Sequence, residues 1–341
     1  MTTGINKILI TGGAGFIGSN FIRYLRAERP DWQLVNYDAL TYAGNPANLA
    51  DLAGDDHYTL VHANVCDRKA VVEALQGCDA VVHLAAESHV DRSIDDCAPF
   101  ISTNVGGTQT LLDACREVGG IRKLVHVGTD EVYGSLPLDR PDLSFAEDWP
   151  VQPRSPYAAS KAAGDLLALA YHETFGVPIA VTRCSNNFGP YQFPEKVIPL
   201  FVTNLLDGRK VPLYGDGLNV RDWVHVVDHC EALLAVLERG LPGEVYNIGG
   251  DNQRNNLELT RAILGLLDFG DDMIEHVTDR PGHDRRYAVN AGKIRRELGW
   301  SPTRSAWPDA LAQTVEWYRA NESWWRPLQA NAFNATNLSA P

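Results

Sequence analysis

The sequence predicts an α/β protein whose larger part is a doubly wound parallel sheet, and three observations lead to this prediction. Short apolar strands alternate with helical segments in the first half of the chain, and the first strand runs into the glycine loop GGAGFIG. Beyond about residue 186 the sequence pattern changes to loops rich in Pro and Gly. Alternating strands and helices are typical of a parallel sheet covered on both faces. We therefore expect a sheet domain over 1–185, to which later segments return, a smaller C-terminal α/β region over 186–330 and a flexible tail over 331–341.

Each element follows from its local pattern. Strands are predicted where apolar residues run for four to seven positions, and helices where apolar residues recur with helical spacing. The last helix of this part has a clear start, because Ser155 and Pro156 are residue types that helix entries prefer. In chain order, the predicted elements are strand 7–10, helix 16–26, strands 32–37 and 58–62, helix 68–75, strand 80–84, helix 104–118, strand 123–127, helix 157–175 and strand 179–183.

Composition limits the class of protein. The formal net charge is −13, which argues against nucleic acid or an anionic membrane as a partner. No apolar run approaches the roughly 18 residues of a membrane span, and no signal-like segment precedes the glycine loop. The six cysteines contain no CxxC pair or metal-ligand spacing, as expected of reduced thiols in a cytoplasmic enzyme. They are Cys66, Cys78, Cys97, Cys115, Cys184 and Cys230.

The glycine loop predicts a dinucleotide site. Gly12, Gly15 and Gly18 lie between a strand and a helix, where backbone amides can hold a pyrophosphate. A second strand ends in Asp38, whose carboxylate can bind ribose hydroxyls and repel a 2′-phosphate. A purely structural glycine turn would not need this acid, so the two features together predict a dinucleotide site. Because the carboxylate would repel a 2′-phosphate, we expect NAD rather than NADP as the cofactor.

Tyr157 and Lys161 are four residues apart on a predicted helix and therefore share a face. An ammonium beside a phenol lowers the pKa of the tyrosine toward working pH, so the tyrosine can take a proton from a sugar hydroxyl. The alternative is a packing tyrosine and a surface lysine. The glycine loop and Asp38 favour the catalytic interpretation.

Two carboxyl groups, Asp130 and Glu131, follow the strand 123–127 directly. They can be a solvated turn or part of a helix cap. They can also be an acid and a base, because two close carboxyls repel when both are ionised, which raises the pKa of one of them.

Longer motifs carry a resemblance to a known family. TGGAGFIG and YAASK resemble the extended short-chain dehydrogenase/reductase family, and further stretches resemble its dTDP-glucose 4,6-dehydratases over about residues 5–300. The resemblance implies a Rossmann-type NAD domain, a C-terminal nucleotide-sugar region and conversion of dTDP-glucose to a 4-keto-6-deoxy sugar. The further stretches are YDALTYAGN, HLAAESHVDRS, GTDEVYG, CSNNFGPYQFPEK, YGDGLNVRDW and DRPGHDRRYAVNAGKIRRELGW.

The resemblance also implies a role for each matching residue. Asp130 would be the acid at C6, Glu131 the base at C5, and Thr129 would bind the C4 oxygen beside Tyr157 and Lys161. Implied cofactor contacts are Gly12, Gly15, Phe16, Ile17, Gly18, Asp38, Asn64, Val65, Ala85, Ala86, Thr103, Tyr157, Lys161 and Asn187. Implied substrate contacts are Ser88, Thr129, Asn186, Lys196, Val197, Pro212, Tyr214, Arg221, Asn256, Asp279 and His283.

Two positions depart from the family pattern. Ala39 stands where a Lys is common after the ribose-binding Asp, and Asn64 stands where an Asp often faces the adenine. Both changes concern cofactor affinity rather than chemistry. We predict no metal, because His225, His229 and His283 show no metal spacing with carboxylates. The family usually forms homodimers through two helices, for which 104–118 and 157–175 are the candidates.

Alternative functions share the glycine loop, Tyr157 and Lys161. A UDP-sugar 4-epimerase, a UDP-glucuronate decarboxylase or a UDP-glucose 4,6-dehydratase would have the same fold, but neither of the first two needs an acid at Asp130 to expel a C6 hydroxyl. A non-catalytic nucleotide sensor would not need Thr129, Tyr157 and Lys161. Preference for TDP over UDP follows from the resemblance alone, since a methyl group contributes only about 1–3 kcal/mol in a pocket.

Overall fold

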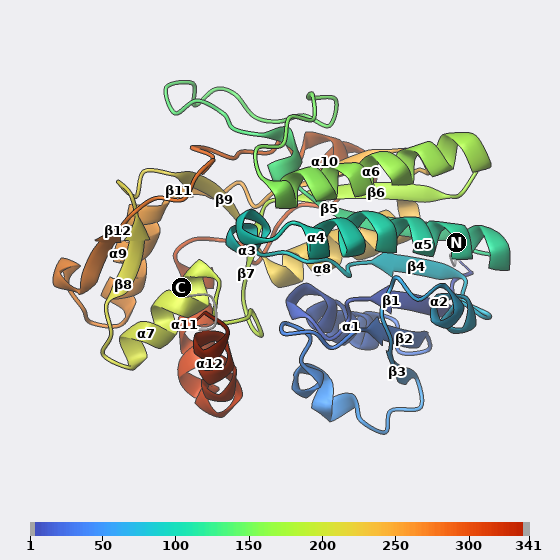
Figure 1. The fold of residues 1–341 in the computed structure, drawn as a ribbon, viewed down its shortest axis with the longest axis horizontal. Coiled ribbons are helices and arrows are strands. Elements are labelled where there is room, and N and C mark those ends of the chain that lie inside the picture. The colour runs from blue at the N-terminus through green and yellow to red at the C-terminus, as the bar shows by residue number, and fades with distance from the viewer. Residues whose placement is uncertain (1–3, 337–341) are drawn as a thin grey trace.

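A seven-stranded parallel sheet is the centre of the larger part of the protein (Figure 1). The computed structural model describes residues 4–336. The strand order is β10-β6-β5-β4-β1-β2-β3, so β10, from the second half of the chain, completes one edge. The strands are β1 (Lys7–Thr11), β2 (Gln33–Asp38), β3 (Tyr58–His62), β4 (Ala80–His83), β5 (Lys123–Thr129), β6 (Ile179–Cys184) and β10 (Val245–Ile248).

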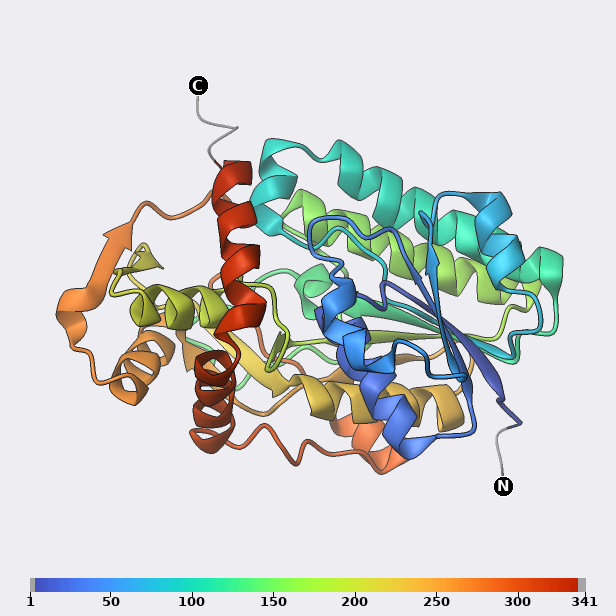
Figure 2. The ribbon, with the colours of Figure 1, turned by 90° about the horizontal axis from the view of Figure 1, so that it is seen from below.

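Both faces of this sheet are buried, as its nearly continuous apolar strands require. Side chains alternate between the faces, so Ile8 and Ile10 belong to one hydrophobic core and Leu9 to the other. The first core is closed by α1 (Phe16–Glu28), α8 (Val226–Arg239) and α10 (Gly292–Leu298), and the second by α2 (Arg68–Ala74), α5 (Thr108–Val118) and α6 (Pro156–Phe175) (Figure 2). The predicted doubly wound fold is therefore confirmed.

The predicted helix 104–118 differs from the structure at its start. Residues Ile101–Gly107 form a π-helical segment that leads into α5. A Cβ on Gly107 would lie only 2.5 Å from Val65 Cγ1, so the glycine allows the chain to pack closely there. π-helical turns interrupt regular helices and are frequent at functional sites. This one carries Thr103 into the lining of the main pocket.

The second part of the protein lies beside the sheet and has its own apolar core (Figure 1). It contains two small sheets, one of order β11-β9-β7 and one in which β12 pairs with β8. Its strands are β7 (Asn186–Phe188), β8 (Val211–Tyr214), β9 (Val220–His225), β11 (Gln253–Asn255) and β12 (Ile274–Val277). Its helices are α7 (Val197–Leu206), α9 (Asn256–Leu266), η4 (Asp271–Met273), α11 (Asp309–Ala320) and α12 (Glu322–Thr336).

Short helices lie in the connections between the elements of the sheet part. They are η1 (Pro46–Leu52), α3 (Val90–Asp95), α4 (Ala98–Phe100) and η3 (Asp130–Tyr133). α12 continues through residue 336, so the first part of the predicted tail 331–341 is helical, and the rest of it lies outside the described residues. The boundary near residue 185 stays a prediction.

Within residues 4–336, no helix is both long enough and apolar enough to span a bilayer.

Candidate active site

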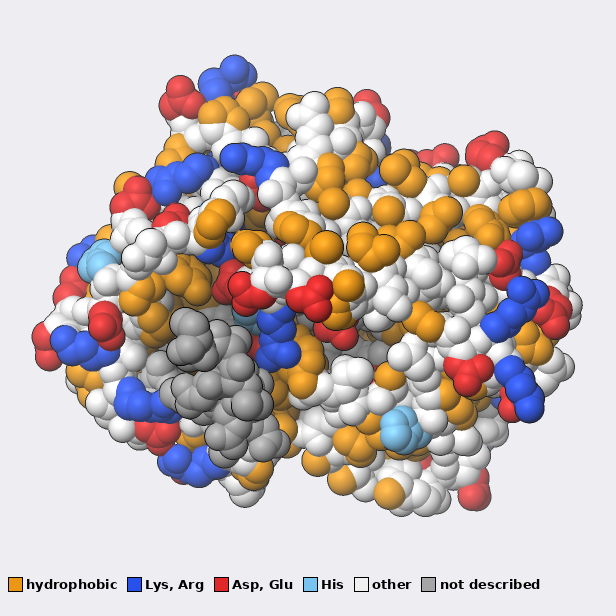
Figure 3. All heavy atoms as spheres, viewed as in Figure 1, with side chains coloured by type: hydrophobic (Ala, Val, Ile, Leu, Met, Phe, Trp, Pro, Cys, Tyr) orange, Lys and Arg blue, Asp and Glu red, His pale blue; other side chains and the backbone are white. Residues whose placement is uncertain are grey.

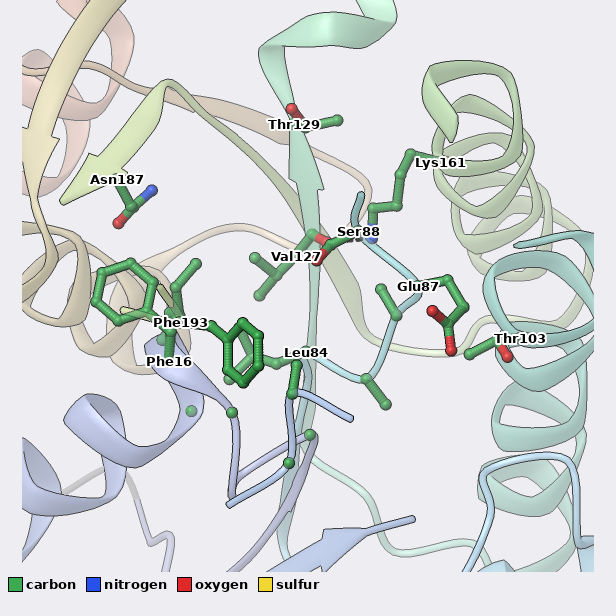
Figure 4. A pocket seen from close by; sticks show the side chains of 18 of the residues that line it. Phe16, Leu84, Glu87, Ser88, Thr103, Val127, Thr129, Lys161, Asn187 and Phe193 are labelled. Atoms are coloured by element: carbon green, nitrogen blue, oxygen red, sulfur yellow. Dashed lines mark hydrogen bonds between the residues drawn. The ribbon is translucent and has the colours of Figure 1, made fainter. Parts of the chain in front are cut away.

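A pocket opens at the carboxyl ends of the parallel strands, which is where ligands bind in open α/β sheets (Figure 4). The loop after β1, the end of β2, the loop after β4, the end of β5 and the start of α6 all reach it. Every residue of the predicted cofactor set and of the predicted catalytic set lines this pocket. The topology therefore brings together segments that are far apart in sequence.

The glycine loop fits a pyrophosphate. Gly12 has a φ of +71°, a conformation that favours glycine. A Cβ on Gly12 would lie 2.7 Å from Ala85 N, and one on Gly18 would lie 2.2 Å from Gly12 O. The loop can be this tight only without side chains, and it leaves the N-terminal amides of α1 available for an anion.

Asp38 stands at the end of β2, facing the same pocket. Its carboxylate accepts hydrogen bonds from Ala14 N at 2.9 Å and Leu40 N at 2.8 Å, which fix its orientation toward a ribose. Burial raises the pKa of Asp38, and these two backbone amides oppose that rise. The residues present therefore fit NAD, although Asn64 Oδ1 already accepts from Cys66 N at 2.9 Å and leaves chiefly its amide nitrogen for an adenine.

The two carboxyl groups after β5 have a local structural origin. Thr129 ends the strand and caps η3, because its Oγ1 accepts from Glu131 N at 3.3 Å. Acidic residues in a first helical turn interact favourably with the helix dipole. Asp130 is only 2% exposed, and its Oδ2 has no hydrogen-bond partner among the described residues, whereas Glu131 is half-buried.

The environments of these two carboxyls differ. Burial raises the pKa of Asp130 well above its ordinary value, and the charges of Glu131 and Asp222 raise it further. Burial also raises the pKa of Glu131, but the cationic side chains of Arg280, Arg221 and Lys196 oppose this. Asp130 is therefore held as an acid, and Glu131 is the member of the pair that ionises more readily.

Tyr157 and Lys161 lie on the first turns of α6, which Ser155 caps by accepting from Ala158 N at 3.1 Å. Tyr157 N donates to Ser93 Oγ at 3.1 Å, and its ring packs edge-on against Phe100. Lys161 points toward β5 (Figure 4), where its Nζ donates to Val127 O at 2.7 Å. Both side chains line the pocket next to the end of β5.

The lowering of the Tyr157 pKa by Lys161 stays a prediction, and burial of the phenol acts in the opposite direction. Burial raises the pKa of Tyr157 well above 10, and the nearby charge of Glu131 adds to the rise, while the hydrogen bond with Thr129 opposes it. Desolvation of the phenol is the largest of these influences, and the Lys161 ammonium donates to a backbone carbonyl close by.

Comparison with known proteins agrees with this geometry. A model of the GDP-mannose 4,6 dehydratase family matches residues 9–307. A curated dTDP-glucose 4,6-dehydratase of Streptomyces niveus is 53% identical, and the match covers 95% of this chain and 96% of the relative. The chain belongs to the dTDP-glucose 4,6-dehydratase family.

Solved structures of this family share the fold. DesIV, the dTDP-glucose 4,6-dehydratase of Streptomyces venezuelae with NAD and TYD bound, has a TM-score of 0.91 and 52% identity and covers 94% of this chain and 99% of its own. The dTDP-glucose 4,6-dehydratase of Bacillus anthracis in complex with NAD has a TM-score of 0.88 and 49% identity, with coverage of 95% and 99%. The resemblance drawn from the sequence motifs is confirmed.

The predicted substrate contacts divide into two groups. Ser88, Thr129, Asn186 and Lys196 line the pocket, and Lys196 Nζ donates to Ser88 O at 2.9 Å. The others lie in the second part of the protein and are absent from the described lining of the pocket. They are Val197, Pro212, Tyr214, Arg221, Asn256, Asp279 and His283.

Several members of the second group form a cluster beside the pocket. His283 Nδ1 bonds Asp279 Oδ1 at 2.6 Å, and the Tyr214 ring packs edge-on against His283. Tyr214 Oη also donates to Asp91 Oδ2 at 3.3 Å, which ties this cluster to α3. Arg221 donates to Asp284 O at 3.0 Å. The substrate role of each of these residues stays a prediction.

Two charged residues of the site escaped the sequence reasoning. Glu195 lines the pocket and accepts from Arg92 Nη2 and Tyr42 Oη, each at 3.1 Å. Arg280 pairs with Asp91 at 2.9 Å and acts electrostatically on Glu131. Both residues belong to motifs that carried the family resemblance, FPEK and DRPGH. Their importance is visible only from the side chains that they contact in the folded protein.

In residues 4–336, no group of three or more His, Cys, Asp and Glu side chains has the arrangement of a metal site. The expected absence of a metal stays a prediction.

Proposed function

We propose that this protein converts dTDP-glucose to dTDP-4-keto-6-deoxyglucose and water, with NAD regenerated in each turnover. The observation that carries the proposal is the pair Asp130 and Glu131, two adjacent carboxyls in different electrostatic environments beside Tyr157. An elimination of water needs such a pair, because one group must donate a proton while the other removes one.

When bound, NAD would supply the redox chemistry, as the acceptor of a hydride from C4 and the donor of a hydride to C6. The glycine loop and Asp38 would hold it. Tyr157 removes the proton of the C4 hydroxyl, and Thr129, whose hydroxyl lies near the Tyr157 phenol, orients that oxygen. The Lys161 ammonium favours the phenolate form of Tyr157 in this step.

Elimination follows from the C4 ketone. The ketone acidifies the C5 proton, because the anion left behind is an enolate. Glu131 takes this proton, and Arg280, Arg221 and Lys196 keep Glu131 more readily ionised than burial alone would allow. Asp130 donates its proton to the C6 oxygen, so that water leaves. The elimination leaves a double bond between C5 and C6. Addition of a hydride at C6 and a proton at C5 removes this double bond and gives the 4-keto-6-deoxy sugar.

The nucleotide is proposed to lie toward the second part of the protein. Arg221 and Asn256 would bind the pyrophosphate, Pro212 and Tyr214 would flank the base, and the Asp279–His283 loop would close over the nucleotide. The support is position: Arg221 lies close enough to affect the pKa of Asp130, and Tyr214 is linked to α3 through Asp91. A thymine nucleotide is preferred here on family grounds.

We also propose a homodimer formed through α5 and α6. Large apolar side chains are exposed on and beside these helices: Leu166 is 56% exposed, Ile101 51% and Phe175 47%. Figure 3 shows hydrophobic side chains gathered over the face on which Figure 1 places α5 and α6. Contiguous exposed apolar surface is typical of interfaces. A cytoplasmic location, expected from the cysteines, stays a prediction.

The activity is tested by incubating the purified protein with dTDP-glucose and no added cofactor, followed by NMR of the sugar. A 4-keto-6-deoxy product supports both the activity and retained NAD. A C4 epimer or unchanged sugar, in protein with verified NAD content, would contradict the proposal. UDP-glucose in parallel measures the nucleotide preference.

The proposed dimer is tested by light scattering. Leu166→Glu is expected to give monomers, whereas the matched control Leu241→Glu, at another exposed leucine, should leave the dimer intact.

A further inference from the structure

A buried ionic cluster lies behind the catalytic lysine and has no part in the chemistry described so far. Asp165 is one helical turn after Lys161 on α6 and is fully buried. Arg183, on β6, donates from Nε to Asp165 Oδ2 at 2.8 Å. His126, on β5, has Nε2 at 3.3 Å from Asp165 Oδ1. In the described part of the chain, none of these three side chains lines the pocket, so none of them touches a ligand there.

The carboxylate of Asp165 adjoins the segment of β5 that supports the site. A Cβ on Gly128 would lie 2.7 Å from Asp165 Oδ1, so the oxygen fills the space that a side chain would take. Gly128 stands between Val127, whose carbonyl accepts the Lys161 ammonium, and Thr129. The carboxylate is thus packed against the strand residues that fix the lysine.

Titratable or charged side chains from four elements of the fold lie around Lys161. They are Tyr157 and Asp165 on α6, His126 on β5 with Asp130 and Glu131 just beyond its end, His83 on β4, and Arg183 and Cys184 on β6.

Few of these groups can balance the charge of the lysine. Burial lowers the pKa values of His83 and His126, so both rings are neutral at neutral pH. Burial raises the pKa of the Cys184 thiol to about 12. For Asp165, the nearby His126 ring and the charge of Arg183 outweigh burial, so its pKa lies below the ordinary value and it is ionised.

We propose that Asp165 is a positioning residue: its carboxylate is the buried counter-charge that keeps Lys161 protonated and directed at the pocket, and His126 and Arg183 hold that carboxylate in place. The proposal rests on the proposed function, in which a charged Lys161 favours the phenolate of Tyr157. Burial lowers the pKa of Lys161, and the charge of Asp165 opposes this shift. Without Asp165, the lysine would lose its proton at lower pH.

The test is the pH profile of Asp165→Asn. The rate of the first step, the appearance of bound NADH on mixing with dTDP-glucose, is expected to fall on its alkaline side at a pH lower by about one unit than in the wild type. The KM for dTDP-glucose should change by less than about twofold, because Asp165 is remote from the pocket lining. The melting temperature and the NAD retained on purification are measured for the same samples.

Matched variants separate electrostatics from packing. His126→Gln removes a neutral neighbour of the carboxylate but leaves both charges, so its alkaline limb should stay in place even if the protein melts earlier. Asp165→Asn leaves Arg183 buried without its partner, and a variant of this kind can fail to fold. The double variant Asp165→Asn/Arg183→Gln removes both charges together and should show an alkaline shift in the same direction, smaller than that of Asp165→Asn because the loss of the Arg183 cation offsets part of it.

Two results would overturn the inference. One is an unchanged alkaline limb in a folded Asp165→Asn or double variant, which would make the cluster only structural. The other is an equal shift in His126→Gln, which would assign the effect to packing. Failure of the proposed function looks different, because the wild type itself would then form no NADH and no keto sugar from dTDP-glucose.

Discussion

Replacing Asp130 by Asn separates the two halves of the proposed reaction. The substitution keeps the size of the side chain and removes its transferable proton. In the structure Asp130 is 2% exposed, its Oδ2 has no protein partner in the described residues, and burial with the charge of Glu131 keeps it protonated. It is thus placed to act on a ligand rather than to support the fold.

The magnitude follows from general acid catalysis, which contributes about 10²- to 10⁴-fold to the rate, or about 3–5 kcal/mol of barrier. We expect Asp130→Asn to oxidise C4 at close to the wild-type rate and to lose water slower by about that factor. Bound NADH should therefore accumulate during turnover, as measured by stopped-flow absorbance.

The matched control is Glu131→Gln, which removes the base instead of the acid. In D₂O, Asp130→Asn should still exchange the C5 proton of the bound sugar, because Glu131 remains, and Glu131→Gln should not. Wild-type elimination in Asp130→Asn, or loss of C5 exchange in that variant alone, would refute the assignment of acid and base.

Three further predictions concern charge and backbone. Arg280→Gln removes a cation that lowers the pKa of Glu131, so the acid limb of the turnover rate should move to higher pH; an unchanged limb would exclude this electrostatic role. Gly18→Ala would place a Cβ 2.2 Å from Gly12 O, so the purified protein should retain little NAD and lose stability by about 1–3 kcal/mol in urea titration; full retention would contradict the predicted cradle. Asp130→Asn should raise stability near neutral pH, because the folded pKa of Asp130 is raised and the penalty for ionising it grows as pH rises above the unfolded value. The gain, measured by urea titration, should vanish at acid pH, and a gain independent of pH would contradict this origin.

Much of the fold was predictable because its signals are local. The strand-helix alternation and the Ser155-Pro156 helix entry depend on neighbouring residues, and these elements were placed to within a few residues. The end of β5 was harder: the strand was predicted to stop at Val127 but continues to Thr129, since sheet pairing with β6 extends to Thr129. The π-helical turn at Ile101–Gly107 depends on close packing against Val65, which no local pattern reveals.

The site was predictable where motifs specify it and not where tertiary contacts do. All predicted cofactor residues line one pocket, because a glycine loop and a strand-end acid have fixed places in this topology. The burial that raises the pKa of Tyr157 and the hydrogen bond of Lys161 to Val127 O are tertiary features that the four-residue spacing does not reveal. Glu195 and Arg280 were missed because their significance lies in pairing with Arg92 and Asp91 on α3.

In the proposed reaction, hydride leaves C4 of the sugar and returns to C6 of the same molecule. This transfer is tested most directly with dTDP-glucose deuterated at C4, purified protein and no added NAD, with the position of the label read by NMR. The expected product is a 4-keto-6-deoxy sugar that carries the deuterium at C6. Deuterium that stays at C4 in an epimer, or that is missing from the C6 methyl group of the product, would contradict the proposed reaction.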